Sequence, residues 1–217
     1  MPIDFYYHPA SPACRLVRLV AAVLDLELSP KDLNLLEGEH LKPEFLKLNP
    51  QHKIPTIVDD GFALGESRAI SRYLLAKYGK NSSLYPEDLE TRAKIDQILD
   101  FELGTLYAGY ANYAHPMFEG APPDPAKLKK IEDGLQILNT MLEGQHYAVG
   151  SELTLADLAL VATVSTLDAM AVSFEKFPNV TKWYELIKTT APKYEEMNGK
   201  GVEMLRGIWA QRLNAAK

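Results

Sequence analysis

The sequence of 217 residues is poor in cysteine, in positive charge and in long apolar runs. Its single cysteine, Cys14, excludes a disulfide bond within the chain and is compatible with a reducing compartment. The formal net charge of −6 argues against a nucleic acid partner, because affinity for nucleic acid depends on lysine and arginine against phosphate. Neither a signal peptide nor a membrane span is visible, so we expect a cytoplasmic protein with no membrane partner.

The histidines do not form a metal motif. They are scattered along the chain, and no pair has the close spacing that zinc ligands require. We therefore predict no metal site and no resident cofactor. The five are His8, His40, His52, His115 and His146.

Two regions with different patterns follow one another along the chain. Short β-rich runs alternate with helical patterns up to residue 80, and helical periodicity dominates from about Thr91 onward. A polar segment that ends in Pro86 separates them. We predict an α/β domain over residues 1–80, a linker over 81–90 and an all-helical domain over 91–217.

Residues 49–70 predict a strand, a tight turn, a second strand and a helix. Asp60-Gly61 is a hairpin signal between two apolar runs. Pro55 holds Ile54 extended, so the Ile54 backbone is available to pair with an extended peptide. The start of the predicted helix, with Ser67 and Arg68, would favour the carboxylate of a ligand, and the Glu66 carboxylate would favour the ammonium group of a ligand. A short zwitterionic peptide is one possible ligand, and an ordinary hairpin with a capped helix remains the alternative.

Ser11 lies between a short strand and a helix. The β-rich run from Ile3 to Tyr7 is broken at Pro9, and apolar residues then recur at helical spacing. Ser11 is therefore predicted to be an N-cap, with Pro12 at the first helical position. From the residues alone, a plain capping role is the commoner one for such a serine.

The segment Gln51-His52-Lys53-Ile54-Pro55-Thr56, followed by Glu66-Ser67-Arg68-Ala69-Ile70, resembles the glutathione-binding half of cytosolic glutathione transferases, with the insect delta and epsilon classes as the nearest match. A capping box at Thr154 and Asp157 is similar to their C-terminal domain. The resemblance covers essentially the whole chain. It implies a thioredoxin-like N-terminal domain with a mixed sheet, Pro55 in the cis form, and an all-α C-terminal domain.

The resemblance also implies a role for Ser11, whose hydroxyl would donate a hydrogen bond to the glutathione sulfur. Such a bond and the helix dipole lower the pKa of a thiol, and a shift of about two units corresponds to about 2.7 kcal/mol. The sequence departs from the family pattern at Ala10, where glycine is expected, and at Pro12, which follows the serine directly. Tyr7, and less so Tyr6, is a rival for the sulfur contact.

Further site residues are implied by the same resemblance. His40 and His52 would lie near the glycine end of glutathione, with an exposed loop residue as the alternative for His40. Lys53 could reach the same carboxylate or be solvated. Glu102 would reach toward the amino end of the ligand across a dimer interface, or would be a solvated helix residue. The implied glutathione-binding residues are His40, His52, Lys53, Ile54, Pro55, Glu66, Ser67 and Arg68. The implied electrophile-binding residues are Tyr107, Tyr110, His115 and Phe118, although an aromatic stripe on a helix is more often core than binding site.

We expect a homodimeric glutathione transferase that conjugates glutathione, its co-substrate, to small hydrophobic electrophiles in detoxification and xenobiotic metabolism. Accessory peroxidase or dehydrochlorinase activity is compatible with the resemblance. The alternative is a non-catalytic ligand-binding protein on the same fold. A glutathione-dependent disulfide reductase would need a cysteine near the position of Ser11, whereas Cys14 lies three residues after it.

Overall fold

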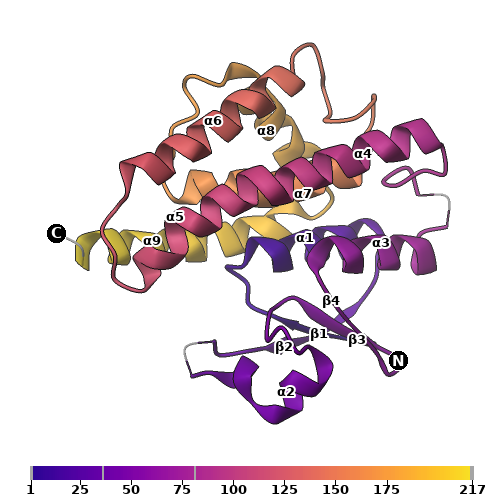
Figure 1. Ribbon diagram of the computed structural model, residues 1–217. Helices are drawn as coiled ribbons and strands as arrows, with labels where there is room; N and C mark the ends of the chain where they lie inside the picture. The colour runs from indigo at the N-terminus through magenta and orange to yellow at the C-terminus, as the bar shows by residue number, and fades with distance from the viewer. Residues whose placement is uncertain (1, 36, 81, 216–217) are drawn as a thin grey trace.

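The computed structural model describes residues 2–35, 37–80 and 82–215 (Figure 1). Its N-terminal part is a four-stranded sheet with helices on both faces, in the strand order β2-β1-β3-β4. Strand β1 runs parallel to β2 and antiparallel to β3, and β4 runs antiparallel to β3, so the predicted mixed sheet is confirmed. The elements are β1 (Ile3–Tyr7), α1 (Pro12–Val23), β2 (Leu28–Asp32), η1 (Glu39–Leu41), α2 (Pro43–Leu48), β3 (Thr56–Asp59), β4 (Phe62–Gly65) and α3 (Ser67–Tyr78).

The hairpin between β3 and β4 forms where the sequence predicts it. Asp59 pairs with Phe62, and the two residues between them have positive φ values of 49° at Asp60 and 83° at Gly61. A two-residue turn of this conformation matches the twist of the flanking strands. The hairpin leads directly into α3, which lies beside α1 on the face of the sheet toward the helical domain, whereas α2 lies on the opposite face (Figure 1).

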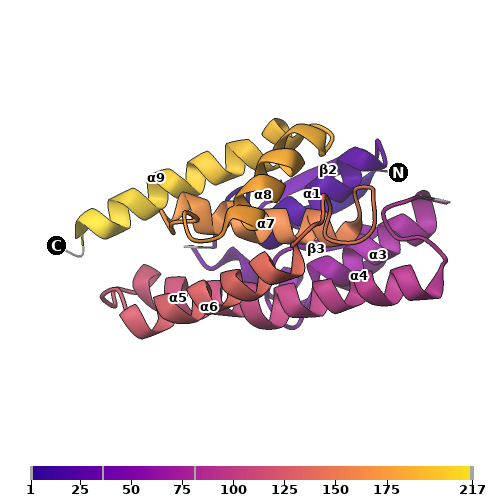
Figure 2. The same ribbon diagram turned by 90° about the horizontal axis from the view of Figure 1, so that it is seen from above.

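The C-terminal part is helical. The helical periodicity that begins near Thr91 corresponds to one long helical run, which contains a π-helical stretch, η2, between α4 and α5. Helix α7 is buried along almost its whole length and lies between the α4–α5–α6 layer and the α8–α9 layer (Figure 2). The elements are α4 (Leu89–Phe101), η2 (Glu102–Tyr107), α5 (Ala108–Phe118), α6 (Pro125–Met141), α7 (Leu155–Ala169), α8 (Pro178–Thr190), η3 (Glu195–Gly199) and α9 (Lys200–Ala215).

Asp157 ties the start of α7 to its surroundings. The predicted capping box with Thr154 is confirmed, and the carboxylate accepts a hydrogen bond from the Thr154 backbone N–H at 2.9 Å. It also accepts bonds from the Ala148 backbone N–H and the Trp183 indole N–H, both at 2.8 Å. Burial raises the pKa of this carboxyl, and the hydrogen bonds oppose the rise. No helix in the described ranges has the length and apolar character needed to cross a bilayer.

Candidate active site

A pocket of about 140 Å³ lies where the predicted peptide-binding segment meets the helical domain. It joins the loop before β3, the starts of α1 and α3, and η2. Seven of the predicted site residues line it together: Lys53, Ile54, Pro55, Glu66, Ser67, Arg68 and Tyr107. Three further residues that the sequence analysis did not assign to the site complete it: Ala13, Asn49 and Leu103.

The loop before β3 is held by Asn49. Its amide nitrogen donates to the Lys53 carbonyl and to the Thr56 hydroxyl, both at 3.0 Å. Its amide oxygen accepts from the Gln51 backbone N–H at 3.0 Å. The Ile54–Pro55 peptide bond is cis, as predicted. No hydrogen bond to the Ile54 backbone is found within the described residues, which agrees with a backbone available to an extended peptide.

The start of α3 carries backbone strain at the pocket. Glu66, its N-cap, has a φ of 65° and a ψ of 108°, a conformation that a non-glycine residue rarely adopts. Such strain costs on the order of 1–3 kcal/mol and occurs mainly at functional sites. Ser67 follows at the first helical position, and its hydroxyl accepts a hydrogen bond from Arg68 Nη1 at 3.0 Å. The helix start is therefore preorganised around a serine hydroxyl and free backbone N–H groups.

Arg68 connects α3 with the helical domain. Its Nε lies 3.0 Å from Oε2 of Glu102, and its guanidinium stacks over the Tyr107 ring at 5.3 Å from the centroid. The other Glu102 oxygen accepts from the Thr163 hydroxyl. Glu102 is fully buried, so the interpretation of a solvated helix residue is wrong. Burial raises the pKa of the Glu102 carboxyl, and Arg68 and Thr163 oppose that rise.

Ser11 is the N-cap of α1, as predicted. Its hydroxyl oxygen accepts from the Cys14 backbone N–H at 3.4 Å. Ser11 itself is not part of the pocket lining, although Ala13 of the same helical turn is. Cys14 is fully buried, and that burial raises the pKa of its thiol to about 11. Cys14 is therefore a packed residue whose thiol is almost entirely protonated at neutral pH.

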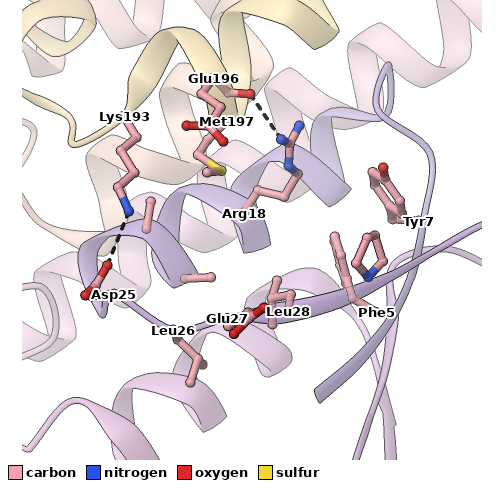
Figure 3. A pocket seen from close by; sticks show the side chains of 13 residues that line it. Phe5, Tyr7, Arg18, Asp25, Leu26, Glu27, Leu28, Lys193, Glu196 and Met197 are labelled. Atoms are coloured by element: carbon pink, nitrogen blue, oxygen red, sulfur yellow. Dashed lines mark hydrogen bonds and ion pairs between the residues drawn. The ribbon is translucent and has the colours of Figure 1, made fainter. Parts of the chain in front are cut away.

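Neither tyrosine rival lines this pocket. Tyr7 stacks on Phe5 at 5.1 Å between ring centroids and lines a separate pocket of about 570 Å³ between α1, β2 and η3 (Figure 3). Arg18 and Met197 lie across that second pocket from the two rings (Figure 3). Tyr6 packs on Phe45 at 5.5 Å, beside α2. Successive side chains of a strand point to opposite faces of the sheet, so the neighbouring residues Tyr6 and Tyr7 of β1 have different surroundings.

His40 and His52 lie beside each other at 6.0 Å between ring centroids, but neither lines the 140 Å³ pocket. His52 has a positive φ of 47° in the loop that Asn49 holds. His40 Nδ1 is buried and has no hydrogen-bond partner in the described part of the chain. The two residues therefore stand together near the site, and their predicted contact with the glycine end of the ligand stays a prediction.

The four predicted electrophile-binding residues lie on η2 and α5. Tyr110 packs between Tyr107 at 5.7 Å and His115 at 6.1 Å. Phe118 is 39% exposed and packs instead on Trp209 of α9, at 5.7 Å. Only Tyr107 lines the pocket at Pro55. Through Trp209, the last helix, α9, therefore packs on the end of α5.

The described residues contain no group of three or more metal-ligating side chains that could hold an ion. The pocket brings the loop at cis-Pro55, the start of α3 and the Tyr107 ring together where the sheet domain meets the helical part.

Comparison with known families identifies that scaffold. Residues 5–82 match the glutathione S-transferase N-terminal domain, and residues 106–189 match the glutathione S-transferase C-terminal domain. The chain therefore belongs to the glutathione S-transferase family, and it is a glutathione transferase enzyme.

Solved structures of insect transferases are similar over the whole chain. A delta-class glutathione transferase of Nilaparvata lugens is 45% identical, with 100% of both chains covered and a TM-score of 0.93. The glutathione transferase BmGSTD1 of Bombyx mori is 44% identical, over 95% of this chain and 97% of its own, with a TM-score of 0.92. An epsilon-class enzyme of Musca domestica is 36% identical, over 97% of this chain and 98% of its own, with a TM-score of 0.92.

Proposed function

We propose that this transferase ionises the glutathione thiol beside Ser11 and adds it to small hydrophobic electrophiles, as a detoxification enzyme of the cytoplasm. The observation that carries the proposal is the pocket at Pro55, which gathers the Ile54 backbone, the start of α3 and Arg68 in one cleft. Ile54 has no backbone hydrogen bond within the described residues, and Arg68 is held by the buried Glu102 behind the cleft. A related silkworm transferase is described as metabolising diazinon, which supports a xenobiotic substrate of that general kind.

Each end of glutathione would meet groups of suitable chemistry in or beside the cleft. The Ile54 backbone would pair with the extended peptide, as in strand addition. A ligand carboxylate would lie at the N-terminus of α3, where Ser67 and free N–H groups favour an anion, and the Glu66 carboxylate would attract the ligand ammonium. His40, His52 and Lys53 would border the glycine end.

The chemical step is a nucleophilic substitution or addition by sulfur. The thiol loses its proton to solvent, and the thiolate electron pair forms the new carbon–sulfur bond. In a substitution the leaving group departs with its own bonding pair, and in an addition a π bond of the electrophile breaks and its electron pair takes up a proton from solvent. Ser11 would donate its hydroxyl hydrogen to the thiolate, and a hydrogen bond to a charged group contributes about 1.5–3 kcal/mol. Holding both reactants together supplies further rate acceleration.

The electrophile would bind on the apolar side of the cleft. Tyr107 and Leu103 form its wall next to Arg68. Tyr110 supports the Tyr107 ring from behind, and His115 and Phe118 would extend the apolar surface toward α9. Apolar walls with few polar groups suit a range of apolar substrates.

We also infer a homodimer. Large apolar side chains are exposed on β4, α3 and α4, and exposed apolar side chains of this size are candidates for a surface that a second copy covers. Sedimentation should give twice the chain mass of 24.2 kDa, and a monomer at micromolar concentration would contradict the inference. The exposed side chains are Phe62, Tyr78 and Leu89.

The test is the rate of glutathione conjugation to an aryl halide, measured across pH for the wild type and for Ser11→Ala. We expect the variant to lose most activity near neutral pH and to recover at higher pH. Asp88→Ala is the matched control, because Asp88 caps α4 through the Thr91 N–H and lies outside the site. Asp88→Ala should remove a comparable helix cap and leave the pH profile of the conjugation rate unchanged.

Two other outcomes would change the assignment. If Ser11→Ala keeps the wild-type profile while Tyr7→Phe shifts it, the hydroxyl that stabilises the thiolate is that of Tyr7. If the wild type binds glutathione but turns over no electrophile, the chain is a binding protein on this fold.

A further inference from the structure

The turn that precedes Ser11 is short and tightly bonded. The Ser11 backbone N–H donates to the His8 carbonyl at 3.1 Å, and the Ala10 N–H donates to His8 Nδ1 at 3.3 Å. Pro9 therefore occupies the second position of a β-turn, where its fixed φ is favoured. Ala10 does not have a positive φ, so this turn does not require the glycine that the family pattern leads one to expect.

The Ala10 methyl group packs into the helical domain. Ala10 is 6% exposed and forms a small apolar cluster with Ala169 at the end of α7 and with Val202 and Leu205 of α9. A glycine at position 10 would lack this contact. The turn that sets the Ser11 hydroxyl is thus packed against the C-terminal helix, which is distant in sequence.

Gly201 marks the closest approach between α9 and this turn. A Cβ at position 201 would overlap the Pro9 carbonyl oxygen and would lie 3.1 Å from the Pro9 carbonyl carbon and 2.7 Å from Arg15 Cδ. Two of these atoms are backbone, so they can move only if the turn moves. Gly207 lies on the same helix with nothing within 4 Å of its own Cβ position. Close contact with the turn, and not a general feature of α9, therefore requires a glycine at 201.

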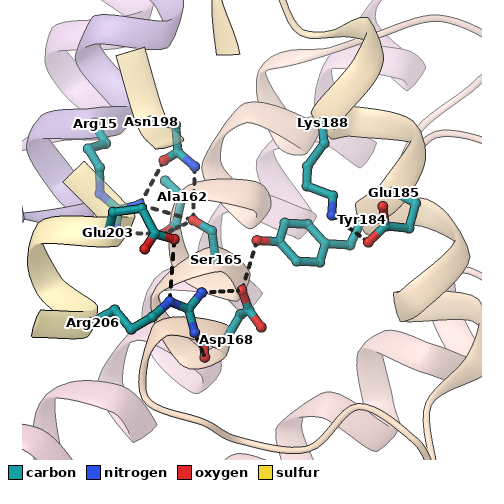
Figure 4. A network of polar contacts seen from close by, with 10 residues as sticks. All are labelled: Arg15, Ala162, Ser165, Asp168, Tyr184, Glu185, Lys188, Asn198, Glu203 and Arg206. Carbon is teal, nitrogen blue, oxygen red and sulfur yellow. Dashed lines mark hydrogen bonds and ion pairs between the residues drawn. The ribbon is translucent and has the colours of Figure 1, made fainter. Parts of the chain in front are cut away.

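The first turn of α1 is anchored to the same helical elements through Arg15. Its guanidinium is fully buried and donates from Nη1 to the Ser165 hydroxyl at 3.0 Å and to the Asn198 amide oxygen at 2.8 Å (Figure 4). Nη2 donates to the Ala162 carbonyl at 3.3 Å. A buried charge with fixed acceptors resists displacement, because any lost hydrogen bond leaves a polar group unsatisfied.

Helix α9 is itself held on α7. Arg206 Nη2 lies 3.1 Å from the Asp168 carboxylate of α7, and Arg206 Nε lies 3.3 Å from Glu203 (Figure 4). Ser11 thus stands at the end of a turn whose two sides are both fixed by the helical domain. One side is the Pro9–Ala10 peptide against α9, and the other is the first turn of α1 against α7 and η3.

We propose that Gly201 is a positioning residue for the conjugation reaction, and that through the Pro9 carbonyl it sets where the Ser11 hydroxyl meets the glutathione sulfur. This inference rests on the proposed role of Ser11. Because a hydrogen bond weakens steeply with poor distance and angle, a small displacement of the turn weakens the bond to the thiolate. The thiolate pKa then rises although every group that touches glutathione is unchanged.

The experiment compares the pH profiles of kcat/KM for the wild type, Gly201→Ala, Gly207→Ala and Ser11→Ala, with thermal unfolding of each. We expect Gly201→Ala to move the midpoint upward by about one unit, which leaves about tenfold less activity below that midpoint. Gly207→Ala should keep the wild-type midpoint, since its methyl group meets open space. If Gly201→Ala does not fold, Val202→Ala removes methyl groups that face Ala10 and should give a smaller shift in the same direction.

A purely structural role gives a different result. It would lower the unfolding temperature of Gly201→Ala and the yield of active enzyme, but would leave the midpoint where it is. That result, with Ser11→Ala shifted, overturns the positioning proposal alone. An unshifted Ser11→Ala profile overturns the proposed role of Ser11, and the positioning proposal with it.

Discussion

Arg68 and Glu102 meet across the two domains, with Nε and Oε2 3.0 Å apart and Glu102 fully buried. Arg68 also contacts Ser67 at the start of α3 and Tyr107 at the wall of the cleft. One ion pair therefore links the packing of the two domains to the helix start that we propose binds glutathione. Replacing either partner should affect both stability and substrate affinity.

Removal of the carboxylate tests this coupling. Glu102→Ala should lower the free energy of unfolding by about 3 kcal/mol, because it leaves a buried guanidinium without its anion. It should also raise the KM for glutathione, since Arg68 no longer holds Ser67. Asp133→Ala is the control, because Asp133 pairs with Lys129 on the exposed face of α6 and should show no measurable loss. Equal effects of the two changes in urea unfolding would contradict this role.

The ring of Tyr107 should matter more than its hydroxyl. Tyr107→Phe keeps an aromatic face over Arg68 and should leave the KM for glutathione near the wild-type value. Tyr107→Leu removes the cation–π contact, which contributes about 0.5–2 kcal/mol, and should raise that KM several-fold. Steady-state kinetics at a fixed electrophile concentration measure both. If Tyr107→Phe raised the KM for glutathione more than Tyr107→Leu, the Tyr107 hydroxyl would be shown to contact the ligand.

Asp59 should make the stability depend on acid pH. It ends β3 nearly buried and accepts hydrogen bonds from Tyr73 at 2.8 Å, Lys77 at 2.8 Å and Tyr78 at 2.7 Å. Burial alone would raise the pKa of the Asp59 carboxyl, but the bonds from Lys77 and the tyrosines outweigh burial and hold it below its ordinary value. Its stabilisation is therefore present above the unfolded pKa of about 3.9 and is lost as pH falls through the folded pKa.

Asp59→Asn provides the measurement. The variant should be less stable at pH 7 by about 2 kcal/mol, because hydrogen bonds to a charged acceptor become bonds to a neutral one. Its stability should also fall less than that of the wild type between about pH 4 and pH 2. Parallel stability curves for the two proteins would show that Asp59 does not titrate with folding.

Features that depend on a few neighbouring residues could be predicted from the sequence. The Asp60–Gly61 turn, the Ser11 cap and the capping box at Asp157 are set by local backbone conformation and short-range hydrogen bonds. The cis bond at Pro55 came from family resemblance, because the local sequence does not fix that isomer. These elements place the β3–β4 hairpin and α3, and with them most of the cleft.

Contacts between distant segments could not be predicted in the same way. Charged residues are mostly exposed, so neither the burial of Arg15 nor that of Glu102 follows from composition. Their partners lie far along the chain, at Asn198 for Arg15 and at Arg68 for Glu102. The π-helical stretch was missed as well, because helical apolar spacing over residues 95–110 does not distinguish π from α turns.

The most direct test of the central claim is titration of the thiol of bound glutathione by its thiolate absorbance, in the wild type and in Ser11→Ala. We expect a midpoint of about 6.5 in the wild type, about two units below the free thiol, and a rise of at least about one unit in the variant. Both proteins should still bind glutathione, because Ile54, Ser67 and Arg68 are unchanged. Identical midpoints in two proteins that both bind glutathione would contradict thiolate stabilisation by Ser11.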